Sequence, residues 1–202
     1  MAAVNDVLKT SETIQYFNPG EASTRKKIVP KNMYYAYIKE VSIKEVPVKK
    51  RYRAKVFNLT LELAEENKTL TFSTNDEDIN GEVYIGRTVR STGVFLFLNP
   101  AEGDDWESNN GANERYLKFC ETIGVECPEV EVELEGEKVK VKQFPVLDAS
   151  DLIGKPVKAY IVEESWTDKG GQTRTSVKAA GFVKWDAPIN NDIKDKHDDI
   201  PF

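Results

Sequence analysis

Histidine and cysteine are scarce in this sequence. Its 202 residues include one histidine, His197, and two cysteines, Cys120 and Cys127. Nucleophilic catalysis by a Ser–His or Cys–His pair therefore has little support. The cysteines do not form a CxxC motif and the histidine lies in a different part of the chain, so a zinc site is not expected. Two reduced thiols in a cytoplasmic protein are the simpler interpretation.

Long apolar runs and phosphate-binding glycine motifs are also missing. The amino terminus has neither the basic nor the apolar region of a signal peptide, and no run approaches the length of a membrane span. No glycine-rich loop is followed by the lysine of a nucleotide-binding loop. We therefore expect a cytoplasmic protein that binds no membrane and needs no metal or other cofactor.

Charge is plentiful but unevenly distributed. The formal net charge is −6, which by itself does not indicate a partner rich in phosphate. Residues 23–55 contain eleven basic and two acidic residues, a balance of +9, whereas residues 99–137 contain twelve acidic and two basic residues, a balance of −10. The two blocks nearly cancel, so the small net charge hides a strongly dipolar chain.

The hydrophobic pattern predicts a mainly β protein. Within residues 52–64, apolar residues from Phe57 to Leu63 alternate with polar ones, which is typical of a half-buried strand. Basic residues just before Phe57 fall on the same line. This suggests either a strand that passes from a groove into the core or a bulge that exchanges its faces. Further strands are expected over residues 33–46, where Pro47 should end the strand, and over residues 70–74, 82–91, 94–98, 156–164 and 174–185.

A helix and an extra hairpin interrupt these strands. Residues 113–123 carry an apolar stripe at helical spacing, with Asn109 or Asn110 as the expected cap and Gly124 at the end. Residues 130–142 alternate Glu or Lys with apolar residues on either side of Gly136-Glu137. With these two residues as the turn, each glutamate of the first half faces a lysine of the second, and Glu133 faces Lys140.

We interpret the order of the elements as two or three strands, a helix, a small hairpin and then two strands in a hairpin, which without the small hairpin is three strands, a helix and two strands. This is the chain order of the OB-fold, a five-stranded Greek-key barrel that binds oligonucleotides on strands 2 and 3 and with the loops beside them. We predict an OB-fold-like barrel with one helix between strands 3 and 4 and an extra β-hairpin. The barrel domain is expected over residues 31–185, between a partly disordered arm, residues 1–30, and an acidic disordered tail, residues 186–202.

Cations and aromatic residues interleave along this expected barrel. A protein that binds single-stranded nucleic acid needs cations along a groove and aromatic faces on which bases stack. Trp166 lies beside a Gly-Gly loop and is hard to bury, whereas Trp185 is expected to close the barrel, and the tyrosines are equally compatible with ordinary packing. The predicted DNA-binding residues are Tyr35, Tyr37, Lys49, Lys50, Arg51, Tyr52, Arg53, Lys55, Arg87, Arg90, Trp166, Lys169, Arg174 and Lys178.

No motif for reading particular bases is present. The sequence has no zinc-finger spacing, no RRM consensus and no evident helix-turn-helix. Binding is therefore expected to be independent of base sequence, to rest on phosphate contacts and stacking, and to weaken with salt.

The sequence ends in Asp198-Asp199-Ile200-Pro201-Phe202. Pro201 disfavours burial of this end in a helix or central strand. The Phe202 ring fits a small pocket, and its carboxylate can be bound by backbone donors or Arg. This end resembles the carboxy-terminal tip of the bacterial-type single-stranded DNA-binding proteins. The rest of the chain resembles the OB-fold single-strand binders of phages in element order and in the placement of charge and aromatic residues.

The resemblance implies a protein without catalytic activity that coats single-stranded DNA in replication, recombination or repair. The tip formed by Asp198, Asp199, Ile200, Pro201 and Phe202 would recruit a helicase, nuclease, primase or polymerase. A phage-encoded protein would act in the cytoplasm of its bacterial host. The chain lacks the long Gly/Pro/Gln linker of the bacterial proteins. Its amino-terminal arm and extra hairpin favour a monomer or dimer over the bacterial tetramer.

Two other classes of protein stay open. The acidic loops at residues 76–78 and 104–105 contain carboxylates of the kind that hold a metal ion in nucleases. Such loops are more often solvated turns. The third class is a structural or adaptor protein whose barrel binds protein rather than DNA.

Overall fold

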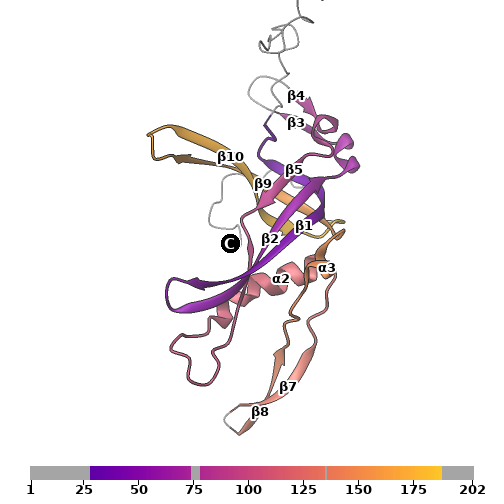
Figure 1. Cartoon of the computed structure of the whole chain (residues 1–202). Helices are drawn as coiled ribbons and strands as arrows, with labels where there is room; N and C mark the ends of the chain where they lie inside the picture. Colours follow the sequence, from indigo (N-terminus) through magenta and orange to yellow (C-terminus); the bar gives the residue numbers. More distant parts are fainter. Residues whose placement is uncertain (1–27, 74–77, 135, 188–202) are drawn as a thin grey trace, which may run out of the picture.

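A closed five-stranded barrel forms the centre of the protein. The computed structural model describes residues 28–73, 78–134 and 136–187 (Figure 1). β1 pairs with both β9 and β2, which closes the sheet in the order β1-β9-β10-β5-β2. β6 pairs with residues 54–57 of β2, on the same edge that β5 uses at residues 60–62. β10 and β5 run parallel and the other neighbours antiparallel. The six strands are β1 (Asn32–Val48), β2 (Tyr52–Leu63), β5 (Thr88–Ser91), β6 (Val94–Phe97), β9 (Pro156–Thr167) and β10 (Thr173–Val183).

This mainly β, OB-like barrel is the architecture that the sequence predicts. The helix α2 (Glu114–Thr122) follows β6 and therefore lies between the third and fourth barrel strands in chain order, as expected. Gly124, with φ of 73°, follows its end. The remaining elements are the ribbons β3 (Thr71–Ser73) with β4 (Asp78–Asn80) and β7 (Glu129–Leu134) with β8 (Glu137–Lys142), the one-turn helix α3 (Ala149–Leu152), and the 3-10 turns Glu65–Thr69, Gly81–Tyr84 and Asn110–Asn113.

The apolar side of β2 faces the barrel interior. Phe57, Leu59, Leu61 and Leu63 are each no more than 1% exposed. The helix α2 packs on one end of this core, where the ring of Tyr116 lies 5.5 Å from that of Phe57. Cys120 of α2 is also fully buried, so its thiol is shielded from water. Among the described residues, no helix is long and apolar enough to cross a membrane.

No bulge interrupts β2 where its character changes from basic to apolar. β2 keeps one register with β6 throughout their pairing, and the register shift against β1 comes from β1, between Ile38 and Glu40. Arg53 and Lys55 therefore share a face with Phe57. This agrees with the expectation of a strand that passes from a groove into the core, and not with a bulge that exchanges its faces. β2 simply runs out of the barrel at its amino-terminal end.

Several strand boundaries differ from expectation. β9 reaches Thr167 rather than residue 164, so Trp166 lies in the strand and not in the loop, and two further differences have a clear cause. Pro47 does not end β1, because it lies opposite Arg53, whose carbonyl accepts a hydrogen bond from Leu98 on the β6 side at 2.9 Å. Pro47 thus occupies a position that needs no N–H for the β1–β2 ladder. Residues 82–87 are not strand, since the Asn80 side chain accepts from the Glu82 N–H at 2.8 Å and starts a 3-10 turn.

The hairpin and the helix cap also differ in detail. In β7–β8, Glu133 pairs with Lys138 rather than Lys140, a shift of two residues from the expected register. Because a shift of two preserves the faces, glutamates still face lysines. Gly136 has φ of 87°, which suits the second position of a type I′ turn. Neither Asn109 nor Asn110 caps α2, because a 3-10 turn over Asn110–Asn113 precedes the helix; the residue at the N-cap is Asn113, whose side chain makes no cap bond.

Candidate nucleic-acid interface

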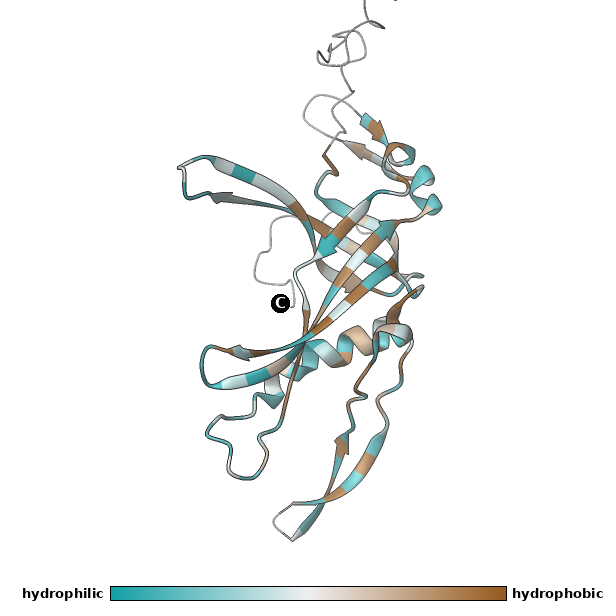
Figure 2. Cartoon of the chain, viewed as in Figure 1, coloured by the Kyte–Doolittle hydropathy of each residue, from teal (hydrophilic) through white to brown (hydrophobic). Residues whose placement is uncertain are grey.

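Two long hairpins extend beyond the barrel. We call the outer parts of β1–β2 and β9–β10 the first and second arms, and in the view of Figure 1 both project to the left. Figure 2 shows that the arms are more hydrophilic toward their tips than at the barrel. Between them lies the outward surface of β2, β5 and β10. β2 and β5 are the second and third barrel strands in chain order, and in OB-folds the face of strands 2 and 3 meets oligonucleotides.

The strand register places cationic side chains side by side on this surface. Arg90 of β5 lies opposite Thr60 of β2 and beside Lys178 of β10. Directly paired residues point to the same side of a sheet. Because Thr60 alternates with the buried Leu59 and Leu61, that side is the outside of the barrel. We call this outward surface of β2, β5 and β10, together with the outward side chains of both arms, the outer face.

Aromatic side chains continue the outer face onto the first arm. Phe95 and Phe97 of β6 lie opposite Val56 and Ala54 of β2, on the outward side. The ring centroids of Phe95 and Phe97 are 6.4 Å apart, and Tyr52 meets Phe97 at 6.2 Å. Phe95 is 37% exposed. The arm thus presents a strip of rings on which bases can stack.

A buried asparagine holds one of these phenylalanines in place. The Asn113 side chain accepts from the Phe97 N–H at 2.7 Å and donates to the Phe97 carbonyl at 3.0 Å. Asn113 is 2% exposed. It replaces a neighbouring strand at the free edge of β6, so the backbone under the Phe97 ring is fixed on both sides.

The second arm carries an exposed tryptophan opposite an arginine. Trp166 is 47% exposed and pairs with Arg174 across the hairpin. Asp168 organises the turn by accepting from Gly170 and Gln172 N–H groups, and it holds the Arg174 side chain at 2.8 Å. These hydrogen bonds, that from Arg174 most of all, lower the pKa of Asp168. The turn keeps Trp166 and its arginine on the outer face.

The tip of the first arm consists of two lysines in an uncommon conformation. Lys49 and Lys50 have φ of 50° and 59°, and the Arg51 N–H closes the turn onto the Val48 carbonyl at 3.2 Å. The left-handed region costs a non-glycine residue roughly 1–2 kcal/mol. Two lysines are a poor choice for stability alone, and strain of this kind is concentrated at functional sites.

Replacing Lys49-Lys50 with Asn-Gly tests this interpretation. Asn-Gly is favoured where both central residues of a turn have positive φ, so the free energy of unfolding should rise by about 1 kcal/mol. Removing two charges should at the same time weaken binding to oligo-dT. Urea unfolding and DNA titration measure the two effects, and a variant that binds DNA as tightly as the parent would exclude these lysines from the interface.

The structure separates part of the predicted basic cluster from the outer face. Arg53 and Lys55 lie on the opposite side of β2 from Tyr52. Arg53 forms an ion pair with Glu45, and its guanidinium lies 6.0 Å from the Trp106 ring. The loop 98–109, which contains Trp106, thus contacts this side of the first arm.

Arg51 is engaged by the same loop. Its side chain pairs with Glu107, whose N–H donates to the Arg51 carbonyl at 2.8 Å. The hydrogen bond from Arg51 to Glu107 raises the pKa of the guanidinium. Sequence reasoning placed Arg51, Arg53 and Lys55 in one cluster with the tip lysines because it could not see which side of the strand the acidic loop covers.

The predicted tyrosines of β1 gather elsewhere. Tyr35 and Tyr37 pack on the Trp185 ring with centroid distances of 4.9 and 5.2 Å. Lys158, 2% exposed, lies with its ammonium 4.6 Å from the Tyr35 ring and donates to the Ala187 carbonyl. Trp185 therefore packs on the outside of β1. The expectation from sequence, that Trp185 closes the barrel interior, is wrong.

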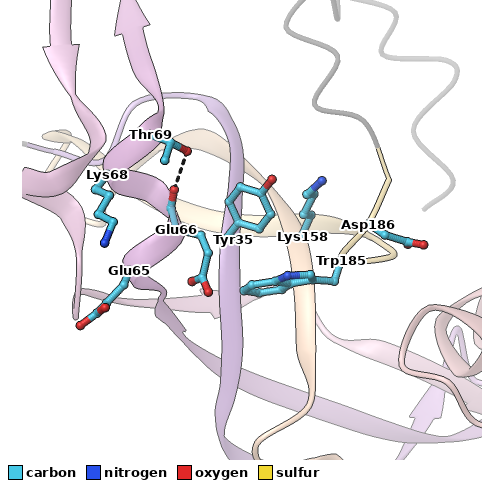
Figure 3. Close-up of a pocket in the computed structure, with 8 residues that line it drawn as sticks. All are labelled: Tyr35, Glu65, Glu66, Lys68, Thr69, Lys158, Trp185 and Asp186. Atoms are coloured by element: carbon cyan, nitrogen blue, oxygen red, sulfur yellow. Dashed lines mark hydrogen bonds between the residues drawn. The ribbon is translucent and has the colours of Figure 1, made fainter.

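This cluster borders a shallow pocket of about 410 Å³ (Figure 3). Carboxylates and ammonium groups both line it, with no excess of positive charge that would favour a phosphate. The pocket lies on the β1–β9 side of the barrel, so it is not part of the outer face between the arms. Its lining residues are Tyr35, Glu65, Glu66, Lys68, Thr69, Lys158, Trp185 and Asp186.

The remaining predicted residues lie at the margins. The Arg87 guanidinium stacks 5.1 Å from the Tyr84 ring, just before β5 begins, and Lys169 is exposed in the turn of the second arm. The acidic loop at residues 76–77 and the tip at residues 198–202 lie outside the described residues. Within the described residues, no group of three or more His, Cys, Asp and Glu side chains gathers closely enough to hold a metal ion.

Phe95 and Phe97 are the main residues of the outer face that sequence reasoning missed. Both were assigned to a strand without a role. Their spacing of two places both rings on one face of that strand, which is the signal that could have identified them. What the spacing does not reveal is whether that face points into the barrel or out of it.

Comparison with known proteins adds no relative. A scan against models of protein families finds no match to the chain, and a search of curated proteins finds none either. A function is therefore proposed from the barrel, its outer face and the residues themselves.

Proposed function

We propose that this protein binds single-stranded DNA along the outer face, without base specificity and without catalytic activity. The observation that carries the proposal is the row formed by Arg90 and Lys178, with exposed Phe95 on one side and Trp166 on the other. The role would be to coat and protect DNA strands in the cytoplasm during replication, recombination or repair. If the gene belongs to a phage, this is the cytoplasm of the bacterial host.

Stacking explains a preference for single strands. An aromatic ring that stacks on a base contributes about 1–3 kcal/mol, and every base has a face to offer. The base faces of a duplex are covered by their neighbours, so the rings of the outer face gain little from double-stranded DNA. The same chemistry accepts RNA, and comparison of oligo-dT with oligo-U measures the preference.

Phosphate contacts supply the remaining affinity. Among the described residues, no ion pair involves Lys49, Lys50 or Arg90, whereas Lys178 pairs with Glu164 and Arg174 with Asp168. These pairs are exposed, and exposed pairs contribute only about 0–1 kcal/mol. A phosphate can therefore replace the carboxylate at little cost, and all five cations are available to a DNA strand.

A titration with oligo-dT at several salt concentrations tests the proposal. We expect Arg90→Ala combined with Lys178→Ala to weaken binding and to lower the slope of log affinity against log salt by about 0.7 for each lost phosphate contact. Lys118→Ala is the matched control, because this exposed lysine of α2 pairs only with Glu114 at 3.0 Å among the described residues. An equal loss in the control, or no loss in the double variant, would contradict the assignment.

Recruitment of replication or repair enzymes by the carboxy-terminal tip is the second half of the proposal. Its support is the resemblance of Asp198-Asp199-Ile200-Pro201-Phe202 to the tip of bacterial single-stranded DNA-binding proteins. Deleting residues 200–202 should leave affinity for oligo-dT equal or slightly higher, because an acidic tail competes with DNA for cations. Binding to helicase, primase or nuclease partners should be lost in pull-down assays. A large loss of DNA affinity would show that the tip has a different role.

A further inference from the structure

The β7–β8 hairpin projects away from the barrel with both of its edges free (Figure 1). In the described part of the chain, β7 and β8 pair only with each other. An ion pair at its base links it to the rest of the fold, where the Lys142 ammonium lies 3.5 Å from the Glu121 carboxylate of α2. A two-stranded hairpin alone is marginally stable in water, and an unpaired strand edge is a template for another strand.

The two edges of this hairpin carry opposite charge. On one face, Glu129, Glu131 and Glu133 line β7, and Lys142, Lys140 and Lys138 lie opposite them on β8. The other face carries valines. In consequence the outer edge of β7 is acidic and that of β8 is basic, while residues 129–142 together hold five glutamates and three lysines. This net negative charge does not favour a phosphate backbone as the partner.

We propose that the partner is the hairpin of a second copy of this chain, with β7 of one copy pairing antiparallel to β8 of the next. Opposite charges across neighbouring strands stabilise pairing and like charges destabilise it. A β7–β7 contact between copies would oppose glutamates, and a β8–β8 contact would oppose lysines. Only β7 against β8 matches each glutamate to a lysine.

Such a contact is head-to-tail and does not close on itself. Each copy that donates its β7 edge keeps its β8 edge free, so copies add in a row. One strand of six residues is a small interface, too small for a stable dimer at low concentration. It becomes effective when copies are held side by side, because tethering raises their effective concentration.

A shared DNA strand provides that tether, and this part of the inference rests on the proposed function. Neighbouring copies on one strand would stabilise each other, so a long oligo-dT should be bound about tenfold more tightly per site than an oligo that holds one copy, from a few cross-strand charge pairs. The hairpin would thus make coating of a strand cooperative.

A charge exchange within the hairpin tests the geometry without disrupting it. The variant combines Glu131→Lys and Glu133→Lys with Lys138→Glu and Lys140→Glu, so opposite charges still face each other inside the hairpin. Alone, it should associate with itself and bind long oligo-dT as cooperatively as the parent. Mixed in equal amounts, variant and parent should bind less cooperatively than either alone, since the edges of unlike copies now carry like charge.

Sedimentation without DNA gives an independent measurement. At rising protein concentration the parent and the variant should each form species larger than dimers, whereas labelled parent in excess variant should not enter them. Equal co-association in the mixture, or no self-association together with no cooperativity, would overturn the inference. Failure to bind short oligo-dT would instead contradict the proposed function and leave the sedimentation result to decide the hairpin contact.

Discussion

Replacing Phe95 and Trp166 together with alanine should weaken binding to oligo-dT by about a hundredfold. Each ring is exposed, 37% and 47% respectively, and the two lie on opposite sides of the cationic row of Arg90 and Lys178. Loss of two stacked bases at about 1.4 kcal/mol each, in the lower part of the range for base stacking, accounts for this factor. Fluorescence anisotropy of labelled oligo-dT measures it.

Val146→Ala is the matched control for this double variant. Val146 is an apolar residue that is 59% exposed on the segment that leads to α3, so its truncation removes exposed apolar surface without touching the outer face. The control should bind oligo-dT as the parent does. A double variant with unchanged affinity would show that DNA does not stack on these rings.

Asn67→Ala should lower the free energy of unfolding by about 3 kcal/mol. Asn67 is fully buried, and its side chain accepts from the Tyr35 N–H at 3.0 Å and donates to the Tyr35 and Ala64 carbonyls at 2.8 and 2.9 Å. Alanine would remove three hydrogen bonds of about 1 kcal/mol each and leave the Tyr35 N–H of β1 without this partner, whereas the Tyr35 carbonyl keeps its bond from the Ala64 N–H at 3.0 Å.

Urea unfolding measures this loss against a matched asparagine. Asn58 is exposed on β2, and among the described residues its side chain makes a single long hydrogen bond of 3.5 Å, to the Ser42 carbonyl. Asn58→Ala should therefore change the free energy of unfolding by less than about 0.5 kcal/mol. Equal effects of the two substitutions would mean that Asn67 does not support the barrel. Oligo-dT affinity should be nearly unchanged in Asn67→Ala at temperatures where the protein stays folded.

The barrel could be predicted because its signals are local. Alternation from Phe57 to Leu63 identifies a strand with one buried face, and the order of elements restricts the topology to few choices. The closure of β1 onto both β2 and β9 follows from that order. Contacts between distant residues could not be predicted, since nothing near Asn67 or Asn113 in the sequence shows that these side chains bind the backbone of Tyr35 and Phe97.

The candidate site was predicted in composition but not in geometry. Arg90, Lys178, Arg174 and Trp166 were identified from charge and exposure, and they lie on one surface because β5 and β10 are parallel neighbours. Arg53 was assigned to the same surface, yet β2 turns it to the other side, where the loop with Trp106 contacts it. A strand has two faces, and composition alone does not say which of them is covered.

Trp166 can report directly on the binding of single-stranded DNA to the outer face. Of the three tryptophans, Trp106 contacts Arg53 and Trp185 packs on Tyr35, so Trp106→Phe with Trp185→Phe leaves only the tryptophan of the outer face. We expect oligo-dT to quench this fluorescence to saturation and salt to reverse the quenching. Oligo-dT that does not bind, or that binds by anisotropy while Trp166 fluorescence stays constant, would contradict this expectation.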